Sequence, residues 1–144
     1  MSKSVPTGYP TKELIDNSVN MLTAGFQVCP DVWSFRIAMI LNIEICIKKL
    51  VLYLRPDLVS SNSKSHQVLN LLGLLAEHIP KLDIFMASLS RSDKVRWRAI
   101  IAFSYTQERY SSYSLETIPP LPLPEDLVEI YWILSEALYY FNLD

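Results

Sequence analysis

The stretch that most constrains the fold is a predicted helix over residues 31–55, which carries two apolar stripes. At 100° per residue, a wide stripe collects these side chains: Met39, Ile40, Ile43, Cys46, Ile47, Leu50, Val51 and Leu54. A narrower stripe holds Leu41, Ile45 and Leu52, and charged or amide side chains separate the two stripes. A helix that is apolar on two sides needs neighbours on both. The pattern therefore predicts that this helix lies at the centre of a helical bundle, or that its narrower stripe faces a second subunit.

Four further helical segments accompany this one. Helices are predicted over 11–28, 65–78 and 92–110, and the last follows Pro124. Pro80 either ends or bends the third of the five, before a further turn or two over 81–88. The side chains turned inward are Ile15, Val19, Leu22, Phe26, Val68, Leu71, Leu72, Leu75, Leu127, Ile130, Leu134, Leu138 and Phe141. Because no segment predicts a strand, the fold class is all-α, a bundle of four to five helices.

The domain organisation follows from length and proline placement. A chain of 144 residues that is half hydrophobic predicts one domain, over 1–144, with its own core. Residues 1–10 are polar and form an N-terminal tail. Residues 118–124, IPPLPLP, are too rich in proline for helix and predict a stiff connector before the last helix. The same stretch resembles a ligand for aromatic-grooved domains, but a connector is the simpler interpretation in a single-domain chain.

Charge and hydropathy exclude several functions. The net charge of −2 cannot hold the chain on DNA or an anionic membrane, so any nucleic-acid contact needs a local patch. The longest apolar run, 37–54, is interrupted by four charged or amide side chains and does not predict a membrane span. The polar, proline-containing start MSKSVPTGYP does not predict a secretory leader. Cys29 and Cys46 form no C-x-x-C pair, so the chain is predicted to be cytoplasmic with reduced thiols.

A cationic, tyrosine-rich cluster lies late in the predicted helix over 92–110. Steps of four, three and four place Arg98, Ala102, Tyr105 and Arg109 on one face, with Tyr113 beside them if the helix extends that far and Lys94 one turn earlier. Tyr110 follows Arg109 directly. Guanidinium groups offer forked donors to phosphate, and tyrosine rings offer stacking surfaces to a base. Arg98, Tyr105, Arg109 and Tyr110 are therefore the candidate ligand-binding residues. The alternative is a solvated cationic face whose tyrosines cover the bundle.

Neither a metal site nor a known catalytic motif is predicted. His66 and His78 lie at the two ends of the predicted helix over 65–78, and no third ligand is near either of them. His66 is better explained as a residue that caps or packs at the helix start. The sequence contains no Walker phosphate loop, nucleophile elbow or H-E-x-x-H motif. No cofactor is expected.

Three segments taken in order resemble the HEPN domain family of small helical, nucleotide-associated domains. NIEICIKKLVL (42–52) is similar to the central helix of that family, where a glutamate precedes a lysine by four residues. SHQVLNLLGLL (65–75) is similar to the helix that follows. YTQERY (105–110) is similar to the Y-x-x-x-R-Y signature, although Ser111 stands where the family usually has proline.

The resemblance implies a small intracellular bundle, often a homodimer, that binds nucleotides or RNA or accompanies a nucleotidyltransferase. The ribonuclease branch of the family needs an arginine followed four to six residues later by a histidine, and neither His66 nor His78 follows one at that distance. In the near-match RAIIAFSY, Phe103 stands where the histidine would be, and a phenyl ring cannot transfer a proton. Either the chain is a member that does not cleave RNA, or this alignment is coincidental and YTQERY gives the true register, which is the favoured interpretation. The sequence therefore favours a protein that is not an enzyme.

The leading hypothesis is a non-catalytic HEPN-like module that dimerises and binds a nucleotide, an RNA or a partner nucleotidyltransferase. Two alternatives stay open. One is a toxin-type ribonuclease of a toxin–antitoxin pair with a degenerate site, and the other is a purely structural oligomerisation partner. The sequence does not identify the ligand or the interface.

Overall fold

The computed structural model describes residues 10–28, 32–57, 66–98, 101–102 and 121–143. Within these residues the chain is helical, apart from connecting segments and one two-residue ladder, so the predicted all-α bundle is confirmed. The elements in chain order are α1 (Lys12–Val28), α2 (Val32–Leu54), β1 (His66–Gln67), α4 (Val68–Ala76), α5 (Pro80–Ser88), α6 (Arg91–Arg98), β2 (Ile101–Ala102) and α8 (Pro124–Tyr140). The described residues thus hold six helices, because the segment after Pro80 forms a helix of its own.

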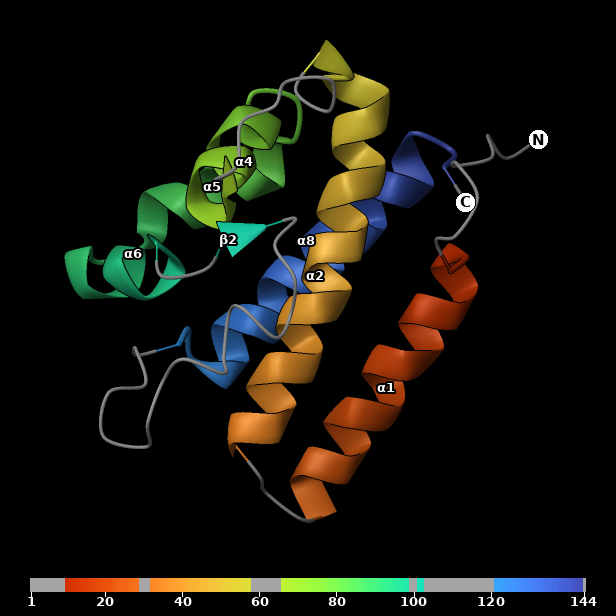
Figure 1. Cartoon of the computed structure of the whole chain (residues 1–144), viewed down its shortest axis with the longest axis vertical. Coiled ribbons are helices and arrows are strands. Elements are labelled where there is room, and N and C mark those ends of the chain that lie inside the picture. Colours follow the sequence, from red (N-terminus) through yellow and green to blue (C-terminus); the bar gives the residue numbers. More distant parts are fainter. Residues whose placement is uncertain (1–9, 29–31, 58–65, 99–100, 103–120, 144) are drawn as a thin grey trace.

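Helix α2 lies at the centre of the bundle, as its two apolar stripes predicted (Figure 1). It packs along α8, and it also contacts α1 and α4. Its wide stripe is buried up to Val51, with Leu54 half-buried, and the narrower stripe of Leu41, Ile45 and Leu52 is half-buried within the same chain. Two charged side chains of α2, Glu44 and Lys49, are buried as well. The Lys49 ammonium donates to the carbonyl oxygen of Pro10 at 2.5 Å and so connects α2 to the residues just before α1.

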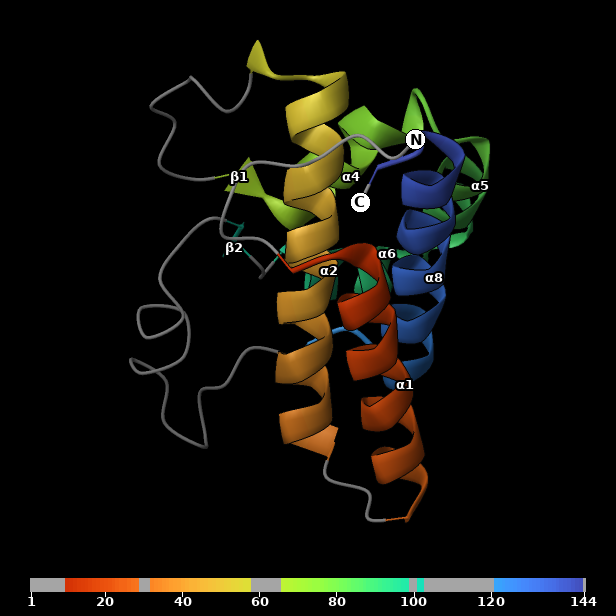
Figure 2. The same cartoon turned by 90° about the vertical axis from the view of Figure 1, so that its right-hand side faces the viewer.

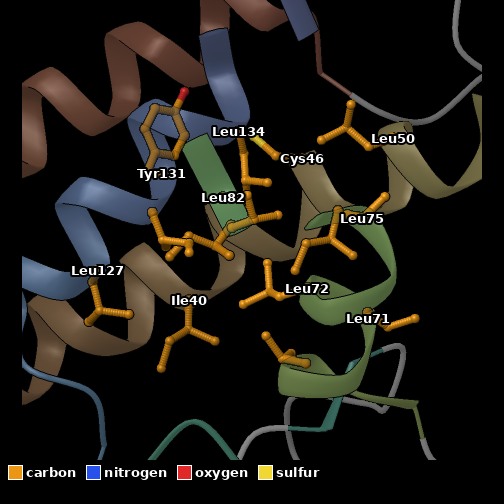
Figure 3. Packing of buried hydrophobic residues seen from close by; sticks show 14 of the residues in the cluster. Ile40, Cys46, Leu50, Leu71, Leu72, Leu75, Leu82, Leu127, Tyr131 and Leu134 are labelled. Atoms are coloured by element: carbon orange, nitrogen blue, oxygen red, sulfur yellow. The ribbon is translucent and has the colours of Figure 1, made fainter. Parts of the chain in front are cut away.

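The core lies where α2, α4, α5 and α8 meet. Figure 3 shows side chains of all four helices pointing into one space. The labelled members are Ile40, Cys46 and Leu50 of α2, Leu71, Leu72 and Leu75 of α4, Leu82 of α5, and Leu127, Tyr131 and Leu134 of α8. Helix α1 covers the other side of α2 and α8 with buried Ile15 and Val19 (Figure 2). The predicted inward faces of α1, α4 and α8 are therefore confirmed.

The last helix begins and ends as its local sequence dictates. Pro124 occupies the first turn of α8, where its missing N–H removes no hydrogen bond, and Glu125 and Asp126 follow it there. At the other end, Asn142 has a φ of 57°, and the Leu143 N–H donates to the Leu138 carbonyl at 2.8 Å. This is a Schellman cap, in which asparagine tolerates the left-handed backbone. Of the predicted connector, residues 121–123 precede α8 without helix and Pro124 begins α8, whereas residues 118–120 and the predicted tail over 1–9 lie outside the described residues.

Two predicted helix limits are wrong. The helix predicted over 65–78 begins only at Val68, because His66 and Gln67 are extended. The helix predicted over 92–110 ends at Arg98, and Ile101 and Ala102 lie in β2. The two strands pair antiparallel, with His66 opposite Ala102 and Gln67 opposite Ile101. This pairing joins residues more than thirty positions apart, so the helical periodicity of either segment could not reveal it. His66 is therefore a strand residue and not the cap of α4.

Two helical glycines occupy positions where contacts within this chain leave room for a side chain. Gly25 in α1 and Gly73 in α4 are exposed, and a Cβ added at either position would meet nothing within 4 Å. We expect Gly25→Ala and Gly73→Ala each to raise the free energy of unfolding by about 0.5–1 kcal/mol, because glycine loses more backbone entropy than alanine in a helix. Urea denaturation followed by circular dichroism measures this. A loss of stability in either variant would show that the added methyl group meets an obstacle.

Candidate functional site

Only part of the predicted ligand site falls within the described residues. Arg98 is the last residue of α6, and its side chain is exposed. Tyr105, Arg109 and Tyr110 lie outside the described residues, as does Phe103. The shared helical face drawn from Arg98 through Ala102 is not formed, because α6 ends at Arg98 and Ala102 is extended in β2. Of the cations that the sequence analysis placed together, the described part of α6 therefore holds Lys94 and Arg98.

Helix α6 carries a cationic surface on the side that faces away from the core. Arg91, Lys94 and Arg98 follow one another at steps of three and four, so they lie on one face, which we call the α6 cationic face. Val95 lies among them and is about half exposed. Trp97 points in a different direction and is 1% exposed. One buried ring therefore anchors this short helix against α4, while Arg91 and Arg98 are exposed and Lys94 is half-buried.

Arg91 is a member of this face that the sequence analysis missed. The helix was predicted to begin at residue 92, but it begins at Arg91, and Ser90 caps it. The Asp93 N–H donates to Ser90 Oγ at 3.2 Å, and the Ser90 hydroxyl donates back to the Asp93 carboxylate at 2.8 Å. A serine followed three residues later by an acid is the pattern of a reciprocal cap. That signal was present in the sequence at Ser90 and would have placed Arg91 in the first turn.

No carboxylate within ion-pair distance neutralises the α6 cationic face among the described residues. The ion pairs formed there are Lys12–Asp16, Arg55–Asp57 and Lys81–Glu136, all on other elements. Arg96 lies on a different side of α6 and donates to the Leu121 carbonyl at 3.1 Å, which holds the segment before α8. Arg91 and Arg98 are exposed and Lys94 is half-buried, and no carboxylate of the described residues pairs with them.

The side of α6 that faces α8 has mixed charge. Burial lowers the pKa of Arg36, and the nearby positive charge of Arg96 lowers it further, while Glu125 opposes the change. Burial raises the pKa of Asp126, and the carboxylates of Asp93, Glu125 and Glu129 raise it further. Since both signs of charge are interspersed here, this side offers no simple anion or cation site.

A second polar cluster connects α1 to α8. The Asp16 carboxylate accepts hydrogen bonds from the Tyr131 hydroxyl at 2.5 Å and the Ser135 hydroxyl at 2.8 Å, and it pairs with the Lys12 ammonium at 2.5 Å. Tyr131 and Ser135 are buried. We call these four residues the Asp16 cluster. A pocket of about 390 Å³ lies beside it, lined by Lys12, Glu13, Asp16, Asn17, Tyr139, Asn142 and Leu143.

The Asp16 cluster is better suited to holding helices together than to proton transfer. Burial alone would raise the pKa of Asp16, but the hydrogen bonds from Lys12, Tyr131 and Ser135 outweigh burial and lower it. Burial and the hydrogen bond to Asp16 raise the pKa of Tyr131. Nearby, burial raises the pKa of the Cys46 thiol to about 12. At neutral pH the carboxylate is a weak base and the phenol and thiol stay protonated, so none of these groups is activated for catalysis.

A third feature is a mostly apolar pocket of about 450 Å³ between the start of α5 and the C-terminal half of α8. Ile133, Ala137 and Tyr140 of α8 line one wall, and Ile79 and Pro80 line the other. Lys81 and Glu136 pair at 2.7 Å and connect the two helices at this pocket. The volume suits a small molecule, but the pocket carries few polar groups that could select one.

No group of three or more histidine, cysteine, aspartate or glutamate side chains in the described part of the chain is placed to hold a metal ion. Similarly, none of the described helices is long and apolar enough to cross a membrane. Comparison of the chain with known protein families, curated proteins and solved structures found no match. What the fold and the surface define is therefore a class: an all-α bundle with a basic helix on its outer side.

Proposed function

We propose that this chain is a non-catalytic helical module that binds the phosphate groups of a nucleotide or an RNA through the α6 cationic face. The observation that carries the proposal is the placement of Arg91, Lys94 and Arg98 on one outer face of α6, on a chain whose net charge is −2. Such a local patch is what the overall charge requires of any nucleic-acid contact.

The geometry of the face suits a chain of phosphates. Arg91 and Arg98 are seven residues apart, which is about 10 Å along a helix axis, and Lys94 lies between them. Arginine forks bind phosphate oxygens in pairs, and lysine contributes a compact charge. Trp97 is buried and fixes the rotation of α6 about its axis. The three cations therefore lie on one face before a ligand binds, so binding does not have to reorient the helix.

The resemblance to HEPN domains contributes the remaining parts of the proposal. Tyr105, Arg109 and Tyr110 are proposed to add stacking surfaces and a further phosphate contact beside Arg98. Two copies of the chain, and a partner nucleotidyltransferase, are proposed on the same basis. The absence of catalysis is supported by Phe103 at the position where a histidine would be needed and by the unreactive state of Asp16, Tyr131 and Cys46.

A matched pair of double variants tests the cationic face. Arg91→Gln/Arg98→Gln removes two charges from α6, whereas Arg55→Gln/Lys81→Gln removes two from other elements. Fluorescence anisotropy with a labelled 20-nucleotide single-stranded RNA, and titration with ATP, should show at least tenfold weaker binding for the α6 variant alone. The slope of log affinity against log salt should fall by roughly 1.4, because each phosphate contact on a single strand contributes roughly 0.7. No binding by the wild type, or equal losses in both variants, would contradict the proposal.

The non-catalytic part is tested separately. Purified protein incubated with total RNA should leave the length distribution of the RNA unchanged over hours at neutral pH. Cleavage that is retained by Arg91→Gln/Arg98→Gln would point to a ribonuclease site elsewhere on the chain. Cleavage that the same variant abolishes would place catalysis at α6. Either form of cleavage would replace the binding module with an enzyme.

A further inference from the structure

Helix α1 has a second apolar stripe on its outer side, in addition to the one that packs on the core. Leu14, Met21 and Val28 are exposed by 61%, 75% and 86%, and they follow one another at intervals of seven. The positions that share their face are filled by small or amide residues. We call the whole set the α1 outer stripe: Leu14, Asn17, Ser18, Met21, Ala24, Gly25 and Val28. It contains no charged residue.

Such a surface is unusual for a helix that faces only water. Exposed helix faces normally carry charged side chains. The exposure of three large apolar side chains along one face is unfavourable, because their contact with water raises the free energy of the folded state. Gly25 also lowers the stability of α1 without any contact in this chain that would require a glycine. Both features are explained if another helix backbone approaches this side closely, because a glycine permits a short distance between helix axes.

We propose that the α1 outer stripe binds the same stripe of a second copy of this chain, with the two helices antiparallel about a two-fold axis at Met21. In this register Met21 meets Met21 of the second copy, and Leu14 meets Val28. Asn17 then lies opposite Gly25, and Ser18 opposite Ala24. Large residues thus face large ones and small residues face small or short polar ones along the whole stripe, which is the self-complementarity that a two-fold contact needs.

The electrostatics and the size of the contact are consistent with a weak dimer. The stripe is neutral along its length, so no charge is buried when two copies meet, and antiparallel helices place opposite ends of their dipoles side by side. Helix α1 has 17 residues and is about 25 Å long. One helix pair of that length buries less than the roughly 1,200 Å² of a standard interface, so we expect dissociation in the micromolar range or weaker.

The α1 contact gives an interface to the dimer that forms part of the proposed function, and it rests on that proposal. It also has a consequence for RNA binding. Helices α1 and α6 lie on opposite sides of α2 (Figures 1 and 2). A dimer formed through α1 therefore leaves the α6 helix of each copy on the side away from the contact. A long RNA could contact both faces, whereas a mononucleotide contacts one, so dimer formation should strengthen RNA binding without changing nucleotide binding.

The first test measures mass in solution by sedimentation velocity from 1 to 500 µM. Wild-type protein should shift with concentration from the 16.5 kDa monomer to twice that mass. Met21→Glu, which places two carboxylates together on the two-fold axis, should remain monomeric. Gly25→Ala should weaken association severalfold although it raises the Tm. Gly73→Ala, the matched exposed helical glycine on α4, should raise the Tm similarly and dimerise like the wild type.

The second test fixes the direction of the two helices. In a Cys29→Ser background, Met21→Cys should form an interchain disulfide under mild oxidation, because position 21 meets itself on the axis. Leu14→Cys should not, because position 14 meets position 28. A wild type that stays monomeric at 500 µM, a dimer unaffected by Met21→Glu, or crosslinking through position 14 would each overturn the proposal. None of these readouts uses a ligand, so the dimer and the phosphate-binding function can fail independently.

Discussion

Replacing Trp97 by alanine is expected to lower the free energy of unfolding by about 4 kcal/mol, since Trp→Ala in a core typically costs 3–5 kcal/mol. Trp97 is 1% exposed and is the buried residue of α6. Without it, only a short, strongly polar helix remains on this side of α4, and α6 should detach. The variant should therefore also lose phosphate binding, although the α6 cationic face itself is unchanged. Urea denaturation and RNA anisotropy measure the two effects.

Trp97→Phe separates packing from hydrogen bonding at the same position. No described residue accepts a hydrogen bond from the buried indole Nε1 of Trp97. Removal of this N–H is then favourable and offsets part of the lost ring volume, so we expect a loss of only about 1 kcal/mol. Trp132→Ala on α8, where the ring is 38% exposed, is the control and should leave binding intact. A small effect of Trp97→Ala would show that α6 is not anchored by this ring.

Removing the Asp16 carboxylate is expected to have the second largest effect. Asp16→Ala leaves the buried Tyr131 and Ser135 hydroxyls without this acceptor and the Lys12 ammonium without its partner. We expect a loss of about 2–4 kcal/mol, because the cost is that of leaving buried polar groups unsatisfied. Asp16→Asn keeps an acceptor oxygen and should lose about half as much. Asp83→Ala, at an exposed position of α5, should change stability by less than about 0.5 kcal/mol.

The contribution of Asp16 to the free energy of unfolding should decrease as the pH becomes acidic. Its pKa in the folded protein is lowered from the ordinary 3.8, so the unfolded chain takes up the proton first as the pH falls. The stabilisation is therefore complete at neutral pH and decreases as the pH falls below about 4, toward the folded pKa. The difference in unfolding free energy between wild type and Asp16→Asn, measured from pH 7 to pH 3, should shrink only at the acidic end. A difference that grows on acidification would contradict the assigned direction.

Much of the helical architecture could be predicted because it depends on local periodicity. The two stripes of α2 require neighbours on two sides whatever their identity, and α8, α1 and α4 occupy those sides. The start of α8 was likewise encoded locally by Pro124 and the acids after it. The separate helix after Pro80 was foreseen only as an extra turn or two, because a proline in a helical pattern is consistent both with a bend and with a new first turn.

The candidate site could be predicted less well than the fold. Arg98 and Lys94 were identified together, but the third member of the α6 cationic face is Arg91, which lies before them, and Ala102 does not continue the helix. The error came from extending one helical period through Ile101 and Ala102, residues whose backbone groups instead pair with β1. A β-branched residue near this point is compatible with either structure, so propensity alone does not decide.

The sequence by itself determined the elements whose cause is a neighbouring residue: apolar periodicity gave the helices, and prolines and caps gave most of their ends. The tertiary structure alone decided what depends on residues far apart in the chain. The β1–β2 pairing ends the continuity of α6, the Asp16 carboxylate meets Tyr131 and Ser135 from α8, and the α1 outer stripe is left exposed. Periodicity marks which faces of a helix are apolar, whereas only the packed fold decides which of them the chain itself covers.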